Sequence, residues 1–222
     1  MKKIILVMLL ALLAAAPTVK AQIPVVGLLT GAIKKVIKAI DLEIQRQQNK
    51  VLWLQNAQKT LENTMSKMHL DDISDWTQKQ KKLYQNYFDE LRKVKEVLAT
   101  YNQVRDMISR QKALVNEYST AWHLLRNDPH FSAQELANMS SVYQSILAES
   151  LQDVEQMELV ITSLATQMSD GRRLDLLSVA DRSLDKNIAQ LRRFNNLNFR
   201  LSLSRATSQQ DAIRTKAMYG IN

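Results

Sequence analysis

The side chains of this sequence that could take part in chemistry are few and widely spaced. The chain has three histidines, His69, His123 and His130, and no cysteine. Histidine metal sites need ligands that converge on one face, and these three are far apart or separated by the turn at Pro129. Without cysteine there are no thiolate nucleophiles, thiolate metal sites or disulfides. We therefore expect no metal site and no cofactor.

The motifs that carry common enzymatic reactions are also missing. The sequence has no glycine-rich phosphate loop, no G-x-S-x-G elbow and no H-E-x-x-H pair, which are the parts needed for nucleotide chemistry, acyl transfer and zinc hydrolysis. Carboxylates occur in pairs, as they do on any charged helix, but nothing in the sequence places one in an apolar pocket that would raise its pKa. We expect no enzymatic activity and no catalytic residues.

Glycine and proline are rare in the middle of the chain. Between Gly31 and Gly171 there are 139 residues without glycine, and Pro129 is the one proline among them. Apolar residues recur at steps of three, four or seven almost throughout this stretch, which is the spacing of amphipathic helices. The pattern predicts an all-α fold, an elongated bundle of three to four long helices with a coiled-coil-like hairpin.

Residues 1–21 have the three parts of a secretory signal, which are two lysines, an apolar run and small residues ending at Ala21. We place the cleavage between Ala21 and Gln22. An uncleaved membrane anchor is the alternative, but the apolar run is short for a span that needs roughly 20 residues. Cleavage would leave 27 Lys and Arg against 22 Asp and Glu, a net charge of +5, and an exported chain without disulfides must be stabilised by its core.

Residues 22–32 form an uncharged apolar segment, in which Pro24, Gly27 and Gly31 are expected to interrupt any regular helix. One interpretation is a strap that covers the end of a helical bundle. The other is an apolar tip that inserts into a partner or makes transient contact with a membrane, since three lysines follow at positions 34, 35 and 38. The candidate partner-binding side chains of this segment are Ile23, Val25, Val26, Leu28 and Leu29.

Residues 33–126 are predicted to form a long helical hairpin, because one apolar stripe runs to residue 68 and a second begins at residue 76. Acidic residues at 71, 72 and 75 separate the two stripes. N-capping explains them better than calcium binding, because the loop lacks the glycine and the distal glutamate of a calcium site. Trp53 and Trp122 are candidate partner-binding anchors, with core packing as the alternative.

Residues 127–222 are predicted to form a C-terminal helical pair with a basic tail, in one structural unit with the hairpin. The turn at 127–131 is the clearest break in the chain, and Ser132 and Glu135 after it have the spacing of a capping box. From Lys186 onward seven basic residues stand against the single acid Asp211. This bias indicates an acidic partner, or pairing with the acidic third helix.

The C-terminal half contains six short blocks that follow one another in a recognisable order. They are Asn127–Leu136, Val142–Tyr143, Leu147–Ser150, Met168–Asp170 with Arg172, Val179–Ser183 and Ala217–Gly220. In order and spacing these blocks resemble the TraI family of conjugative-transposon transfer proteins. Residues 22–126 are similar in character to the TrbJ and minor-pilin subunits of type IV secretion systems. The relaxase that shares the name TraI is unrelated, since it needs a nucleophilic tyrosine beside clustered histidines.

The resemblance implies an exported, all-helical structural component of a conjugative type IV secretion apparatus, in the periplasm or at the cell surface and pilus. Such a minor-pilin-like protein would act in assembly or cell contact by binding other secretion or pilus subunits. It would take no small-molecule substrate, and direct nucleic-acid binding is not expected. The family defines no functional residues. The alternative is a periplasmic holdase chaperone whose helical surfaces bind unfolded clients.

Overall fold

The computed structural model describes residues 24–65, 73–163 and 168–221, and in these ranges every regular element is a helix. The helices are α2 (Pro24–Met65), α3 (Ile73–Arg126), α4 (Ala133–Ser163), α5 (Asp170–Ser204) and α6 (Gln209–Tyr219). The all-α prediction is therefore confirmed. The predicted signal with its cleavage site at Ala21 and Gln22, the partner-binding candidate Ile23 and the acids at positions 71 and 72 lie outside the described residues.

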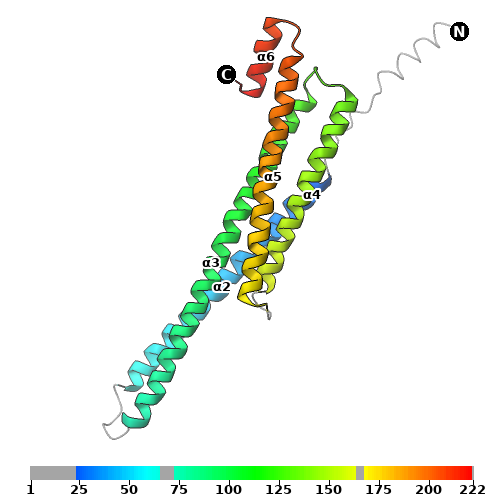
Figure 1. Ribbon diagram of the computed structural model, residues 1–222. Coiled ribbons are helices and arrows are strands. Elements are labelled where there is room, and N and C mark those ends of the chain that lie inside the picture. Colours follow the sequence, from blue (N-terminus) through cyan, green and yellow to red (C-terminus); the bar gives the residue numbers. More distant parts are fainter. Residues whose placement is uncertain (1–23, 66–72, 164–167, 222) are drawn as a thin grey trace, which may run out of the picture.

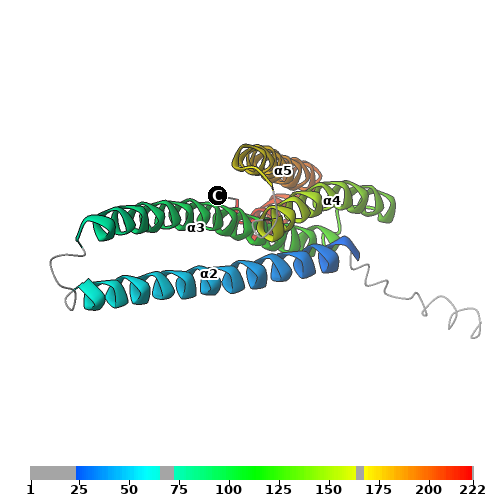
Figure 2. The same ribbon diagram turned by 90° about the horizontal axis from the view of Figure 1, so that it is seen from below.

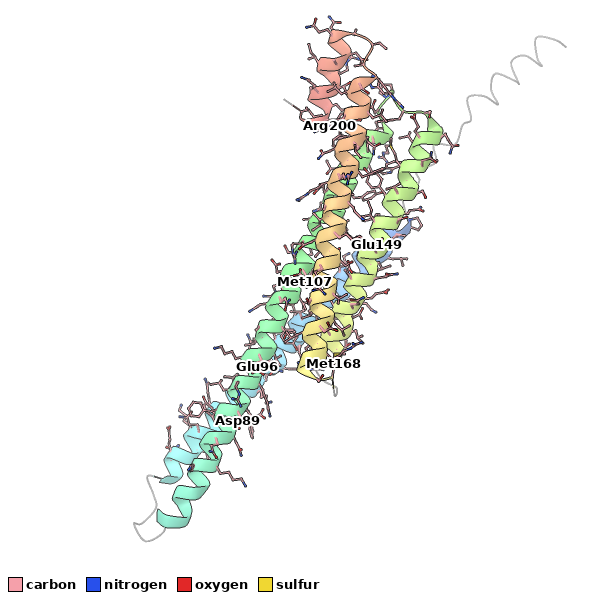
Figure 3. The ribbon with its side chains drawn as sticks, in the orientation of Figure 1. Asp89, Glu96, Met107, Glu149, Met168 and Arg200 are labelled. Atoms are coloured by element: carbon pink, nitrogen blue, oxygen red, sulfur yellow. The ribbon has the colours of Figure 1, made fainter. Side chains whose placement is uncertain are left out.

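The molecule is elongated because α2 and α3 form an antiparallel hairpin that is longer than the pair of helices packed against it (Figure 1). Helices α4 and α5 cover one half of the hairpin, and the other half extends past them (Figure 2). Met168 marks the end of the α4–α5 pair, at the level of Glu96, and Asp89 lies farther out (Figure 3). We call the uncovered part, residues 47–65 and 73–95, the arm.

The N-terminal segment is helical, so the prediction that Pro24, Gly27 and Gly31 would interrupt a helix was wrong. Helix α2 begins at Pro24 and continues to Met65. Proline is well suited to the first helical position, because its missing N–H would have no partner there. The two glycines each cost about 1 kcal/mol relative to alanine, but this cost is offset by the burial of apolar side chains around them, including Leu29, which is 0% exposed.

The helices begin and end at capping residues, which form hydrogen bonds with the unpaired backbone N–H or C=O groups of the first or last turn. The capping box before α4 is confirmed, since Ser132 N donates to Glu135 Oε2 at 2.9 Å and Glu135 N donates to Ser132 Oγ at 3.3 Å. Helix α5 has Ser169 as its N-cap and α6 has Ser208. Gly220 ends α6 with a φ of 64°, a left-handed conformation that glycine adopts without strain.

The core of the bundle is a continuous set of buried side chains from α2 to α5. Tyr143 of α4 lies at its centre, with its ring edge-on to Tyr118, Trp122 and Phe194 at centroid distances of 5.0, 5.8 and 5.1 Å. Its hydroxyl donates to Asn195 Oδ1 at 2.6 Å, so the ring is buried without an unpaired polar atom. Edge-on aromatic contacts of this kind stabilise a core beyond the area they bury.

Three of the seven basic residues from Lys186 onward form ion pairs within the bundle. Lys186 contacts Glu149 of α4 at 3.3 Å, Arg205 contacts Glu135 at 2.6 Å, and Arg192 of α5 contacts Glu117 of α3 at 3.0 Å. Two of the three partners lie on or at the acidic third long helix, as one of the two sequence-based interpretations proposed. Exposed pairs of this kind stabilise a fold by less than about 1 kcal/mol each, so they mainly set the relative positions of the helices.

Candidate functional site

Five polar residues meet where the α3–α4 turn, the end of α5 and the short helix α6 come together. We call this group the turn cluster, and its members are Asp128, His130, Ser202, Asp211 and Tyr219. Asp128 and Ser202 are 3% and 0% exposed. Groups this deeply buried must find partners inside the protein, because an unpaired polar group would be strongly destabilising.

Asp128 is the acceptor at the centre of the turn cluster. Ser202 Oγ donates to its Oδ2 at 2.5 Å, and the Tyr219 hydroxyl donates to the same oxygen. Its Oδ1 accepts from the backbone N–H of His130 at 2.9 Å and faces the Nδ1 atom of that ring at 2.7 Å. Burial would raise the pKa of Asp128, but these hydrogen bonds together lower it below the ordinary value.

His130 is held between two carboxylates from different parts of the chain. Its Nε2 atom lies 3.1 Å from Asp211 Oδ2 on α6, opposite the contact between Nδ1 and Asp128. The hydrogen bond with Asp211 raises the pKa of His130, burial lowers it, and Asp128 raises it further, with a net increase. The pKa of Asp211 is lowered by the same hydrogen bond from His130 and by the backbone N–H of Thr207. His130 therefore connects the turn to α6, and its protonated form would make an ion pair on each side.

Serine, histidine and aspartate in contact are the residue types of a hydrolase triad, but their geometry here is different. In a triad the serine contacts one ring nitrogen and the aspartate the other. In this cluster Ser202 Oγ and Asp128 both lie on the Nδ1 side, at 3.2 and 2.7 Å, and Nε2 faces Asp211. Ser202 donates its proton to a carboxylate and is fully buried, so a substrate has no access to it. The arrangement fastens α6 to the bundle.

Arg205 reinforces the same junction from the end of α5. Its guanidinium donates to the carbonyl oxygen of His130 at 2.8 Å and to both oxygens of Glu135, at 3.1 and 2.6 Å. It also lies over the ring of Phe131, 5.5 Å from the centroid, a favourable cation–π arrangement. The hydrogen bond from Arg205, with those from Ser132, lowers the pKa of Glu135 to about 2.

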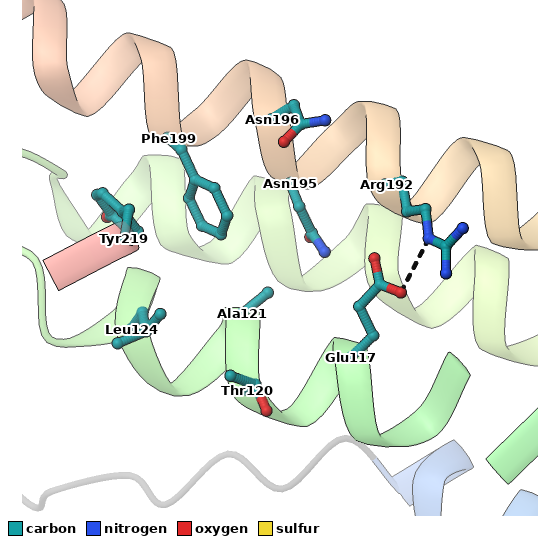
Figure 4. Close-up of a pocket in the computed structure, with 9 residues that line it drawn as sticks. All are labelled: Glu117, Thr120, Ala121, Leu124, Arg192, Asn195, Asn196, Phe199 and Tyr219. Carbon is teal, nitrogen blue, oxygen red and sulfur yellow. Dashed lines mark hydrogen bonds and ion pairs between the residues drawn. The ribbon is translucent and has the colours of Figure 1, made fainter. Parts of the chain in front are cut away.

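A groove of about 560 Å³ lies next to the turn cluster, between α3, α5 and α6 (Figure 4). The Arg192–Glu117 ion pair closes one end, and at the other end Phe199 and Tyr219 stack with centroids 4.2 Å apart. Its full lining is Glu117, Thr120, Ala121, Leu124, Arg192, Asn195, Asn196, Phe199 and Tyr219. The groove is open to solvent and holds no cluster of titratable groups beyond that ion pair.

A second buried carboxylate lies in the middle of the bundle. Asp153 of α4 is 3% exposed and accepts a hydrogen bond from Asn187 Nδ2 of α5 at 3.1 Å. Burial raises its pKa to about 6, although the hydrogen bonds from Ser183 and Asn187 act in the opposite direction. The sequence had given no sign of a carboxylate in surroundings that raise its pKa, because only the packing of α3, α4 and α5 encloses this one.

The predicted partner-binding residues are spread over the molecule. Trp53 on the arm and Leu28 near the start of α2 are 67% and 62% exposed. Leu29 is fully buried, and Val25 and Val26 pack against the core, so these three stabilise the bundle and present little surface to a partner. Trp122 is half-buried, with its ring against Tyr143, so the alternative of core packing describes it. The structure does not bring the candidates together in one patch.

The three histidines also have separate surroundings. His69 lies outside the described residues, and His123 is exposed, with Nδ1 3.1 Å from Arg126 Nη2. Within the ranges that the structure describes, no group of three or more histidine, cysteine, aspartate or glutamate residues could hold a metal ion. None of the described helices is long and apolar enough to span a bilayer.

No protein-family model, no curated protein and no solved structure matches this chain significantly.

Proposed function

We propose that this protein is an exported structural component of a conjugative type IV secretion apparatus, similar to a minor pilin, which acts by binding other subunits. The arm is the observation that supports this proposal most directly. It is a helical hairpin that extends away from the bundle, and within it only Leu54 and Val94 are buried apolar side chains among the residues whose exposure is described. Such a projection is suited to contact with a partner.

The arm exposes apolar side chains that a solitary hairpin cannot cover. Trp53 and Leu52 of α2 are 67% and 56% exposed, and Phe88 and Leu91 of α3 are 63% and 37% exposed. Large aromatic side chains are enriched at protein interfaces, where they bury much area at a low cost in conformational entropy. The four exposed side chains of the arm are well separated in sequence from the connection between α2 and α3. They lie along the sides of the arm, where another helical subunit could pack.

The sequence blocks that resemble the TraI family give a second support. Two of them, Asn127–Leu136 and Ala217–Gly220, are far apart in the chain but supply Asp128, His130 and Tyr219 to the turn cluster. A resemblance that falls on residues in mutual contact fits a shared fold of the C-terminal half.

The test is to delete the gene from its native element and complement it with arm variants. Replacing Trp53 and Phe88 together by alanine should lower conjugative transfer at least tenfold, with normal cell growth and an unchanged amount of folded protein in the envelope. The matched control is Leu197→Ala, which removes a side chain that is 57% exposed on α5 of the bundle. Equal transfer by the double variant and the wild type would reject the arm as the binding surface.

The holdase alternative rests on the same exposed apolar side chains but predicts a different behaviour. A chaperone protects many unrelated clients, whereas a subunit of an assembly binds one or two partners. Light scattering from an unrelated unfolded client separates the two. Suppressed aggregation at near-equimolar protein, with transfer unaffected by the gene deletion, would favour the chaperone.

A further inference from the structure

The middle of the bundle contains a layer of polar side chains from three helices. We call it the polar layer, and its members are Gln111 of α3, Ser150 and Asp153 of α4, and Asn187 of α5. Gln111 Nε2 donates to the carbonyl oxygen of Ser150 at 3.4 Å. Ser150 and Asp153 are three residues apart and so share a face of α4. All four side chains therefore lie along one turn of α4, since Gln111 contacts the backbone of Ser150 and Asn187 contacts Asp153.

Ion pairs at the surface confirm that the three helices meet at this level. Arg110, the neighbour of Gln111, contacts Asp181 and Asp185 of α5. Lys186, the neighbour of Asn187, contacts Glu149 of α4. The polar layer is therefore enclosed, with charged pairs on the outside and, inside, three neutral side chains beside the Asp153 carboxylate.

Three side-chain atoms of the polar layer have no hydrogen-bond partner within the described part of the chain. They are Gln111 Oε1, Ser150 Oγ and Asn187 Oδ1, from residues that are each 0% exposed. Proteins leave few buried polar atoms unpaired, because each one costs about 1–3 kcal/mol. The donors of Gln111 and Asn187 are already used, so what remains is two carbonyl oxygens and one hydroxyl beside the Asp153 carboxylate.

The charge of Asp153 also lacks a partner. Its hydrogen bonds come from Asn187 and Ser183, which are neutral. The charged groups nearest to it are Glu149 and Lys186, and these two pair with each other at the surface, 45% and 60% exposed. A buried carboxylate without a nearby cation is unfavourable unless it is neutralised.

We propose that the polar layer binds a small alkali cation, with Na⁺ as the preferred ion. The ligands are one carboxylate oxygen of Asp153, the amide oxygens of Gln111 and Asn187, and the hydroxyl of Ser150. Hard cations prefer oxygen ligands, whereas zinc and copper prefer nitrogen or sulfur. A single carboxylate matches one positive charge, while calcium sites in proteins draw on several carboxylates.

A water molecule or a proton would satisfy only some of the unpaired groups of the polar layer. A water molecule could donate hydrogen bonds to the two amide oxygens but would leave the carboxylate charge in place. A proton would neutralise Asp153 and give it one O–H donor, which could pair with a single amide oxygen and would leave the other amide oxygen unpaired. A cation satisfies both, and it joins α3, α4 and α5 at the centre of the bundle.

The experiment measures unfolding of the full-length protein by heat and by urea at pH 7.5. The salts compared are NaCl, KCl and choline chloride at constant ionic strength. Because Na⁺ binds the folded state, each tenfold rise in its concentration above the dissociation constant should raise the folding equilibrium constant tenfold. Choline is too large to enter and should give no such rise. Equal stability in NaCl and choline chloride overturns the proposal.

Two variants locate the effect. Asp153→Asn removes the charge and should abolish the dependence on Na⁺ while the protein stays folded. Glu155→Gln, an exposed acid two residues away on the same helix, should keep the full dependence. A dependence on Na⁺ that survives Asp153→Asn would place the ion elsewhere and overturn the assignment. Stability that responds to acid through Asp153 but not to Na⁺ would show that a proton alone neutralises the layer, which also overturns it.

Discussion

Two aspartates of this bundle are equally buried, and their pKa values move in opposite directions. Asp128 in the turn cluster and Asp153 in the polar layer are each 3% exposed. The pKa of Asp128 is lowered, whereas that of Asp153 is raised to about 6. Burial acts on both in the same way, so the difference comes from the groups that face each carboxylate.

The turn cluster lies at the end of the helices, where backbone and side-chain donors are available. Asp128 accepts from the His130 backbone N–H and from two hydroxyls, and it contacts the His130 ring. In the middle of a helix every backbone N–H already donates to the carbonyl four residues earlier. Asp153 can therefore be met only by side chains of neighbouring helices, and those that reach it are neutral. A buried charge is stabilised more readily where helices end than where they cross.

The largest expected effect is the loss of the acceptor in the turn cluster. Asp128→Ala leaves Ser202, Tyr219 and His130 without their shared partner, so the free energy of unfolding should fall by about 4 kcal/mol at pH 7. Urea unfolding followed by circular dichroism measures it. Asp185→Asn, which changes an exposed carboxylate paired with Arg110, should cost under about 0.5 kcal/mol. Similar losses in both variants would contradict the comparison.

The second prediction concerns Asp153→Asn and its dependence on pH. Because the folded pKa of Asp153 is about 6, above the ordinary aspartate value of 3.8, its contribution to stability is fully present below about pH 4 and is lost as pH rises through 6. The asparagine variant has no carboxyl group at this position, so its stability does not fall in this way as pH rises. In choline chloride, its stability relative to wild type should rise by up to about 3 kcal/mol between pH 4 and pH 8. A difference that stays flat over this range would mean that Asp153 is neutralised within the chain.

A third and smaller effect is expected for Asp211→Asn. The raised pKa of His130 stabilises the fold below the ordinary histidine value, and this contribution is lost as pH rises through the folded value. The lowered pKa of Asp211 contributes above the ordinary aspartate value and is lost as pH falls. The variant should lower the free energy of unfolding between pH 4 and pH 6.5 and lower it less at pH 9. NMR titration of His130 should show its pKa decrease in the variant, and an unchanged pKa would remove Asp211 from the cluster.

The smallest expected effect is a stabilisation that leaves the comparison intact. A Cβ at Gly31 meets no atom within 4 Å, and the residue is in the interior of α2, so Gly31→Ala should add about 0.5–1 kcal/mol. Combined with Asp153→Asn, it should raise thermal stability without changing the dependence on pH, since Gly31 belongs to neither polar region. A changed dependence on pH would show that α2 contributes to the surroundings of Asp153.

Residue patterns predicted the architecture well, because amphipathic spacing and capping are local. Ser132 and Glu135 marked the start of α4, and the long stretch without glycine marked α3 as helical. The error at Pro24 arose because the cost of two glycines is small compared with the burial of the α2 stripe. That burial depends on contacts with α4, which a local pattern does not contain.

The polar regions could not be predicted in the same way, because their members are distant in the chain. Asp128 and Tyr219 are 91 residues apart, and Gln111 and Ser150 are 39 apart. Asp128 and His130 are only two residues apart, but the sequence pattern marked their turn as a break between helices and nothing more. A solitary serine or asparagine on a helix gives no such signal until the neighbouring helix is placed.

Helix α3 is a single element of 54 residues without glycine or proline, about 80 Å from end to end. One of its ends forms the arm, and the other leads directly into the turn that holds Asp128. A force applied to the arm by a bound subunit would therefore be transmitted along α3 to the bundle, because α3 has no glycine or proline at which it could bend. The hydrogen bonds of the turn cluster lie at the opposite end of α3 from the arm, where they would oppose such a force.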